Sequence, residues 1–125
     1  MAEHGVTRGI SEKLSAFGQE FGKVLDPVAF LNEKDPVLCA AFLRLHELTL
    51  SEGVLSKRQK FLIHSAITAV QHDREATVMH LMGALRAGAG EQELLETACT
   101  IIPVAGMPAF GVFLAAWKQA EQAGK

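Results

Sequence analysis

The sequence predicts an all-α protein of about six helices, arranged around a central antiparallel helical hairpin. Apolar residues recur at helical spacing along the 125-residue chain, and no segment alternates as a half-buried strand does. Hydrophobic residues make up 49% of the chain, aromatic residues only 6%, and tyrosine is absent. Ala, Leu and Val therefore carry the apolar content, which favours closely packed helices. The length predicts one domain over residues 1–125, with residues 1–10 flexible.

The first half of the chain contains three helix starts. Ser11 can cap a first helix over residues 11–25. The Asp-Pro pairs at residues 26–27 and 35–36 each place a capping residue before a first-turn proline. The second pair opens an amphipathic helix that we expect to end at Gly53.

The central hairpin is expected over residues 56–87. Ser56 and Gln59 have the form of a capping box and start its first helix. Asp73 can cap the second helix, and Gly88 suits the C-terminal end of that helix. Apolar residues at helical spacing predict the core stripe of the first helix: Leu62, Ile63, Ala66, Ile67 and Val70.

The last third of the chain predicts two apolar helices. Glu91 and Glu93 lie in the first turn of one helix, where the helix dipole favours negative charge. Pro103 is expected to end this helix, and Pro108 to begin the last one. No charged residue occurs from 97 to 117, a stretch long enough to span a bilayer. Because prolines and glycines interrupt it, we expect two short helices buried against another subunit instead.

Charge and motif content exclude several classes of function. The net charge of −2 is spread without a basic stripe, so nucleic acid is not an expected partner. The N-terminus lacks the apolar region of a signal peptide, which predicts a cytoplasmic protein without a membrane partner. Cys39 and Cys99 lie far apart and form no CxxC, as is typical of reduced core cysteines. His64, His72 and His80 form neither HxxxH nor HExxH, and no Gly-rich phosphate loop occurs, so we expect no metal and no cofactor.

Three consecutive stretches carry a family resemblance. They read LSKRQKFLIHSAITAV, then HDREATVMHLMGALRAGAGEQELLETA, then AGMPAFGVFLAAWK. Together they resemble the carboxymuconolactone decarboxylase family, which includes the alkylhydroperoxidase D-like proteins. The resemblance covers about residues 34–120. It implies an alkylhydroperoxidase D-like helical fold that assembles as a trimer or hexamer.

The resemblance also shows which functional positions have changed. The peroxidase branch carries Cys-x-x-Cys-x-x-x-His, with a glutamate on the preceding helix as a proton relay. Here Asp73 and Ala76 stand at the cysteine positions, Phe61 at the glutamate position, and His80 at the histidine position. Without thiols, dithiol reduction of peroxide is not supported. The lactone decarboxylase branch keeps the histidine without the cysteines, and this chain is more similar to that branch. That branch usually has a glutamate one turn before the histidine, where this chain has Ala76.

Helical geometry predicts a site around the remaining histidine. Asp73, Thr77 and His80 share one face of their helix, because spacings of three, four and seven residues bring side chains together. In an antiparallel hairpin His64 would face the same cavity, with one imidazole as base and the other as acid. We therefore predict His80 and His64 as catalytic residues, and Asp73, Thr77 and Phe61 as substrate-binding residues. The expected chemistry is that of a lyase, decarboxylase or isomerase acting on a small carboxylate or lactone.

Plainer interpretations stand beside this one. His80 can be a buried structural residue, His64 a structural or interface residue, and Asp73 a helix N-cap. In that case the chain would be a non-catalytic oligomeric protein that binds a ligand or has a structural role. A further alternative is an alkylhydroperoxidase-type antioxidant activity through Cys39 or Cys99.

Overall fold

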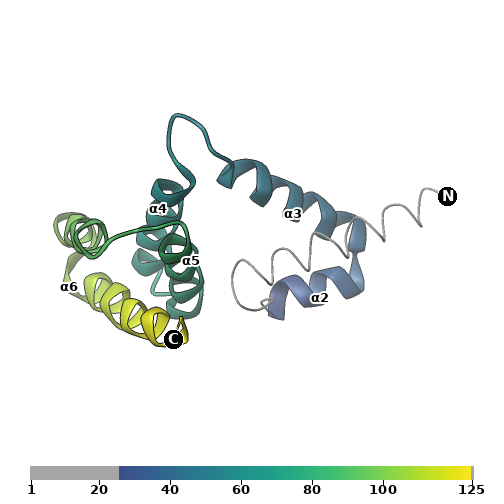
Figure 1. Cartoon of the computed structure of the whole chain (residues 1–125). Coiled ribbons are helices and arrows are strands. Elements are labelled where there is room, and N and C mark those ends of the chain that lie inside the picture. Colours follow the sequence, from purple (N-terminus) through teal and green to yellow (C-terminus); the bar gives the residue numbers. More distant parts are fainter. Residues whose placement is uncertain (1–25, 125) are drawn as a thin grey trace. The chain divides into compact units, whose positions relative to one another are not determined.

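The structure is a computed structural model that describes residues 26–124, and every regular element in that range is a helix. The helices are α2 (Asp26–Lys34), α3 (Pro36–Leu50), α4 (Lys57–Val70), α5 (Arg74–Arg86) and α6 (Glu91–Ala123) (Figure 1). The predicted all-α class is confirmed. The chain divides between Ser51 and Glu52 into two compact units, called here the N-terminal unit and the C-terminal unit. The flexible segment expected at residues 1–10 and the helix expected over residues 11–25 lie outside the described residues.

The N-terminal unit contains α2 packed on α3. Asp35 caps α3 as predicted, because its carboxylate accepts the Leu38 amide at 3.1 Å. Val28 is buried, and its carbonyl lies 3.8 Å from the Sγ of Cys39, which is fully buried. The helix ends at Leu50, so the prediction that it runs to Gly53 is three residues too long.

The C-terminal unit contains the predicted antiparallel hairpin. Three contacts cross it: Phe61 with Gly83, His64 with His80, and Thr68 with Thr77. The residue numbers rise on α4 as they fall on α5, so the two helices run in opposite directions (Figure 1).

Both helices of the hairpin begin at the predicted capping residues. The Ser56 hydroxyl accepts the Gln59 amide at 3.0 Å, and the Gln59 side chain accepts the Ser56 amide at 2.8 Å, which confirms the capping box. Asp73 caps α5 through the Ala76 amide at 3.0 Å. Gly88 follows α5 with φ of 94°, a backbone conformation in which glycine carries no steric cost.

The predicted core stripe of α4 is correct at Leu62, which is buried, and wrong at its β-branched residues. Ile63, Ile67 and Val70 are 45%, 51% and 44% exposed. The buried residues of the helix are Phe61, Leu62, Ser65 and Ala69. The reason lies in α5, whose Gly83 lets the Phe61 ring approach its backbone closely. Close approach of the two helices selects the face with an aromatic ring and small side chains rather than the face with β-branched ones.

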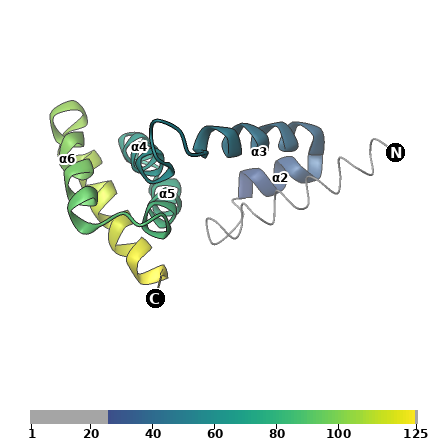
Figure 2. The ribbon, with the colours of Figure 1, turned by 45° about the horizontal axis from the view of Figure 1, so that its top comes forward.

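Helix α6 is interrupted at a different residue from the one expected. Pro103 lies within the helix, and the backbone leaves helical geometry at Gly106, where φ is 83° and ψ is 177°. The prediction that Pro103 ends the helix is therefore wrong, because the positive φ that changes the chain direction is available to glycine and not to proline. Pro108 lies in the first turn after the break, where its missing N–H has no partner to lose. Figure 2 shows the two segments of α6 meeting at an angle.

Helix α6 contacts both helices of the hairpin and leaves an apolar face outside. Its inward face contributes Leu94, Ala98, Ile101, Ala109, Phe113, Ala116 and Ala120 to the core. Val104 and Met107 remain 86% and 60% exposed. Within the described residues α6 is the one helix long and apolar enough to cross a membrane. The break at Gly106 divides it into segments that are each shorter than the roughly 20 residues of a spanning helix.

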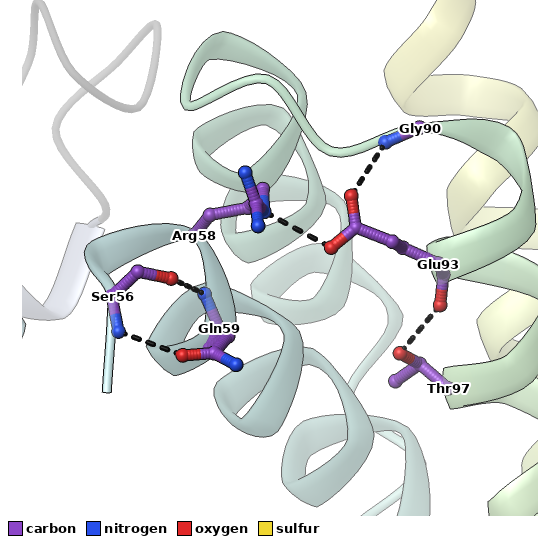
Figure 3. Close-up of polar contacts among 6 residues, drawn as sticks. All are labelled: Ser56, Arg58, Gln59, Gly90, Glu93 and Thr97. Atoms are coloured by element: carbon purple, nitrogen blue, oxygen red, sulfur yellow. Dashed lines mark hydrogen bonds and ion pairs between the residues drawn. The ribbon is translucent and has the colours of Figure 1, made fainter. Parts of the chain in front are cut away.

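A polar cluster ties the start of α6 to the start of α4 (Figure 3). The Glu93 carboxylate accepts the Gly90 amide at 3.2 Å and lies 3.0 Å from Nε of Arg58 on α4. The Thr97 hydroxyl donates to the Glu93 carbonyl at 2.7 Å. Glu93 thus caps its own helix and also holds α6 against the hairpin, a role that its position in the first turn does not reveal from sequence alone.

Candidate functional site

The structure brings His64 and His80 together across the hairpin. Their ring centroids are 5.0 Å apart, and the ring planes meet at 82° in an edge-to-face contact. His64 comes from the middle of α4 and His80 from the middle of α5, and both side chains are half-buried. Two rigid helices, rather than loops, therefore set the separation of the two imidazoles.

Burial changes the proton affinity of one ring. Desolvation lowers the pKa of His64 from its ordinary value of 6.5, because burial disfavours the charged imidazolium. His64 is therefore neutral at pH 7 and available to accept a proton. A positive charge on either ring disfavours a positive charge on the other at this short distance. The two imidazoles are therefore suited to carry one proton between them and transfer it, and not to be protonated at the same time.

Phe61 lies in the packed interior of the hairpin, one helical turn before His64. It is 1% exposed, and a Cβ added to Gly83 would lie 2.5 Å from its Cε1 atom. The ammonium group of Lys57 lies 5.9 Å from the centroid of its ring. The position at which the resemblance implies a glutamate in the peroxidase branch therefore holds a buried apolar ring. The sequence-predicted contact of Phe61 with substrate stays a prediction.

Thr77 is fully buried and bonded within the hairpin. Its hydroxyl lies 2.7 Å from the Asp73 carbonyl and 2.9 Å from the Thr68 hydroxyl. Each hydroxyl has one hydrogen, and the shortest contacts are satisfied when Thr77 donates to Asp73 and Thr68 donates to Thr77. Thr68 was not among the predicted site residues. The antiparallel register that pairs His64 with His80 also places Thr68 opposite Thr77, and this was the signal available in the sequence.

Asp73 lies at the exposed start of α5, where its carboxylate accepts the Ala76 amide. Seven residues separate it from His80, or roughly 10 Å along a helix. The structure therefore places Asp73 in the N-cap role and does not bring its carboxylate to the histidine pair. A contact between Asp73 and substrate stays a prediction.

The two cysteines lie in different units of the chain. Cys39 belongs to α3 of the N-terminal unit, and Cys99 is exposed on α6 of the C-terminal unit. Burial raises the pKa of the Cys39 thiol, because the thiolate would lose its hydration. In the part of the chain that the structure describes, no three His, Cys, Asp or Glu side chains are grouped as metal ligands.

Comparisons with known proteins agree with this fold. A crystal structure of a candidate carboxymuconolactone decarboxylase from Burkholderia xenovorans LB400 has a TM-score of 0.78 and 25% identity, covering 95% of this chain and 97% of that one. The apo structure of a carboxymuconolactone decarboxylase family protein from Legionella pneumophila has a TM-score of 0.74 and 23% identity, covering 88% and 98%. A search of curated proteins found no significant match. The sequence model of the carboxymuconolactone decarboxylase family matches residues 36–119, about two thirds of the 125 residues, and the chain therefore belongs to this family.

Proposed function

We propose that this protein uses His64 and His80 as an acid–base pair on a small carboxylate or lactone, as a decarboxylase or isomerase. The observation that carries the proposal is the 5.0 Å contact of the two rings across a rigid hairpin. His80 matches the histidine that the lactone decarboxylase branch retains. His64 supplies a second protic group on the preceding helix, one turn beyond the position where a glutamate is replaced by Phe61.

Either reaction can be written with two imidazoles alone. In a decarboxylation the C–C bond to the carboxylate breaks, CO₂ leaves, and the electron pair passes into the lactone carbonyl as an enolate. An imidazole that has taken a proton from water then delivers this proton to carbon, and water protonates it again for the next turnover. In an isomerisation the neutral imidazole, for which His64 is suited, removes a proton beside the carbonyl and returns it at another carbon.

The surrounding residues would support this chemistry indirectly. Phe61 would provide apolar surroundings one helical turn from His64, and a less polar environment strengthens electrostatic interactions with a developing enolate. The Thr68–Thr77 contact would hold the two helices, and with them the two imidazoles, in register. We expect Asp73 to act in the same way through the start of α5, and direct contact of Asp73 or Thr77 with substrate remains a prediction.

Turnover of carboxymuconolactone and of simpler carboxylated lactones tests the proposal. His80→Ala is expected to lower kcat by roughly 10²- to 10⁴-fold, the usual contribution of a positioned histidine, and His64→Ala to have an effect of the same kind. His72→Asn is the matched control, because it removes an exposed histidine that lies outside the pair. Circular dichroism and the oligomeric state should be unchanged. Unaltered turnover in both histidine variants would show that the pair is structural and favour the non-catalytic, ligand-binding role.

An alkylhydroperoxidase-type activity is less supported. The buried Cys39 has a raised pKa and is therefore a poor nucleophile, and Cys99 lies alone on another helix. We expect no thiol-dependent peroxide consumption, and no change on Cys99→Ser. Peroxide turnover that disappears in Cys99→Ser would overturn this view.

We also propose that the protein self-associates, as a cytoplasmic trimer or hexamer, through an apolar stripe on α4 and α6. The stripe consists of Ile63, Ile67, Val70 and Val104, each at least 44% exposed. Ile67, Val70 and Val104 also line an open groove of about 370 Å³ between the two helices. Exposed apolar surface of this kind marks an interaction site. In analytical ultracentrifugation Ile67→Asp should shift the protein to a smaller species, and an unchanged sedimentation coefficient would locate the interface elsewhere.

A further inference from the structure

A second groove lies on the C-terminal unit, where the start of α5 meets the C-terminal half of α6. Its volume is about 590 Å³, within the usual size range of small-molecule sites. Arg74 lines it from α5, and one stripe of α6 lines it from the other side, including Gly111, Leu114 and Lys118. Neither histidine of the acid–base pair is among the residues that line it.

The charges around this groove are of one sign. Arg74 and Lys118 both line it, both are exposed, and within residues 26–124 neither takes part in an ion pair. Two carboxylates near them in sequence accept other hydrogen bonds: Glu121 accepts the Trp117 indole N–H at 2.7 Å, and Asp73 accepts the Ala76 amide. None of the described lining residues is acidic. The described lining of the groove therefore carries two cations and no carboxylate.

The position of Arg74 adds to this effect. It is the first residue of α5, where the helix dipole disfavours a positive side chain, so an anion bound beside it would relieve an unfavourable interaction. The rest of the lining is mixed. Leu114 offers apolar contact, and the side-chain amides of Gln119 and Gln122 offer hydrogen-bond donors.

We propose that this groove binds a small organic anion, a carboxylate or phosphate monoester with an apolar body. The planar guanidinium of Arg74 can hold either headgroup through two parallel hydrogen bonds, and Lys118 can act as a point charge beside it. The apolar body lies along Leu114. This binding site is separate from the proposed acid–base chemistry, so either proposal can fail without the other.

Gly111 gives a direct way to block the groove. A Cβ added there would meet no atom within 4 Å, so a side chain at this position enters the open space without disturbing the core. Replacing an exposed glycine within a helix also improves helix propensity. Gly111→Leu should therefore fold at least as well as the wild-type chain while occupying the site.

Binding of octanoate, octyl phosphate and neutral octanamide to the full chain, measured by titration calorimetry, tests the proposal. The two anions are expected to bind and the amide to bind more weakly, and the tighter anion identifies the preferred headgroup. Arg74→Gln combined with Lys118→Gln should weaken anion binding by roughly 10- to 100-fold, as expected when charge-assisted hydrogen bonds are lost. Lys34→Gln combined with Arg44→Gln removes the same charge from the N-terminal unit and should leave binding unchanged.

Two further variants locate the bound anion. Gly111→Leu should weaken binding of both anions without lowering the melting temperature. Ile67→Asp, in the apolar groove between α4 and α6, should leave their binding unchanged. The proposal is overturned if octanamide binds as tightly as octanoate, if the Arg74 and Lys118 variant retains its affinity, or if Ile67→Asp removes binding while Gly111→Leu does not.

Discussion

The two faces of α4 contrast in composition and in burial. One face carries Ile63 and Ile67, which are about half exposed. The other carries His64 and Ser65 beside Phe61, and this more polar face is the one packed on α5. The most apolar stripe of a helix thus identifies a surface that needs a partner, but it does not identify that partner as the core of the same unit.

The polar face tolerates burial because its hydroxyls are satisfied locally. Ser65 is fully buried, and its hydroxyl donates to the Phe61 carbonyl of its own helix at 2.8 Å. Thr68 contacts the His64 and Ser65 carbonyls as well as Thr77 across the hairpin. A serine or threonine therefore adds little penalty at a close helix–helix contact, whereas Ile would hold the helices apart.

The largest expected effect is a difference in the free energy of unfolding between substitutions on the two faces of α4. Phe61→Ala should lower the free energy of unfolding by about 3–5 kcal/mol, because it removes a buried ring and leaves a cavity in the core. Ile67→Ala, on the half-exposed face, should cost less than about 1 kcal/mol in the monomer. Urea unfolding followed by circular dichroism measures both values.

Protein concentration sharpens this comparison. If the chain self-associates through Ile67, the apparent stability of the wild type rises with concentration and that of Ile67→Ala rises less. If Phe61→Ala and Ile67→Ala lowered the free energy of unfolding equally at high dilution, both faces of α4 would belong to the core, contrary to the exposure of Ile67.

The next effect concerns the hydroxyl contact across the hairpin. Thr77→Val keeps the shape of the side chain and removes a buried hydroxyl with two partners, so we expect a loss of about 1 kcal/mol. The Asp73 carbonyl stays bonded to the Thr77 amide, which limits the cost. A double cycle with Thr68→Val, measured by urea unfolding, should show that the two losses are not additive. Strict additivity would mean that the two hydroxyls do not interact.

Local signals in the sequence predicted most of the fold. Capping by Asp35, Ser56 and Asp73 is a short-range effect of side-chain oxygens on nearby amides, and the structure shows all three. The break in α6 was expected at Pro103 and occurs at Gly106. A proline removes one hydrogen bond from a helix that can otherwise continue, while the glycine's positive φ changes the direction of the chain.

The candidate site was less accessible from the sequence. The family motif indicated His80, and the antiparallel register then indicated His64. Both residues could be found because the motif and the register depend only on the spacing of residues in the sequence. Which face of α4 turns toward α5 depends on the close fit of Phe61 against Gly83, a non-local contact that periodicity does not encode. The anion groove was missed for the same reason, since Arg74 and Lys118 are 44 residues apart and only the packing of α5 on α6 brings them to one surface.

The smallest expected effect is a pH dependence that belongs to the packed face. Burial lowers the pKa of His64 in the folded protein, so between its ordinary value of 6.5 and the lower folded value the unfolded chain binds a proton that the folded chain does not. The free energy of unfolding should therefore fall as pH decreases below 6.5, and His64→Asn should lose less stability over the same interval. His72→Asn is the control, because it removes an exposed imidazole from the turn, where φ is 59° and asparagine is tolerated. Chemical unfolding at pH 7.5 and 5.5 measures these changes in the free energy of unfolding. Equal losses in the wild type and in His64→Asn would contradict the burial of His64.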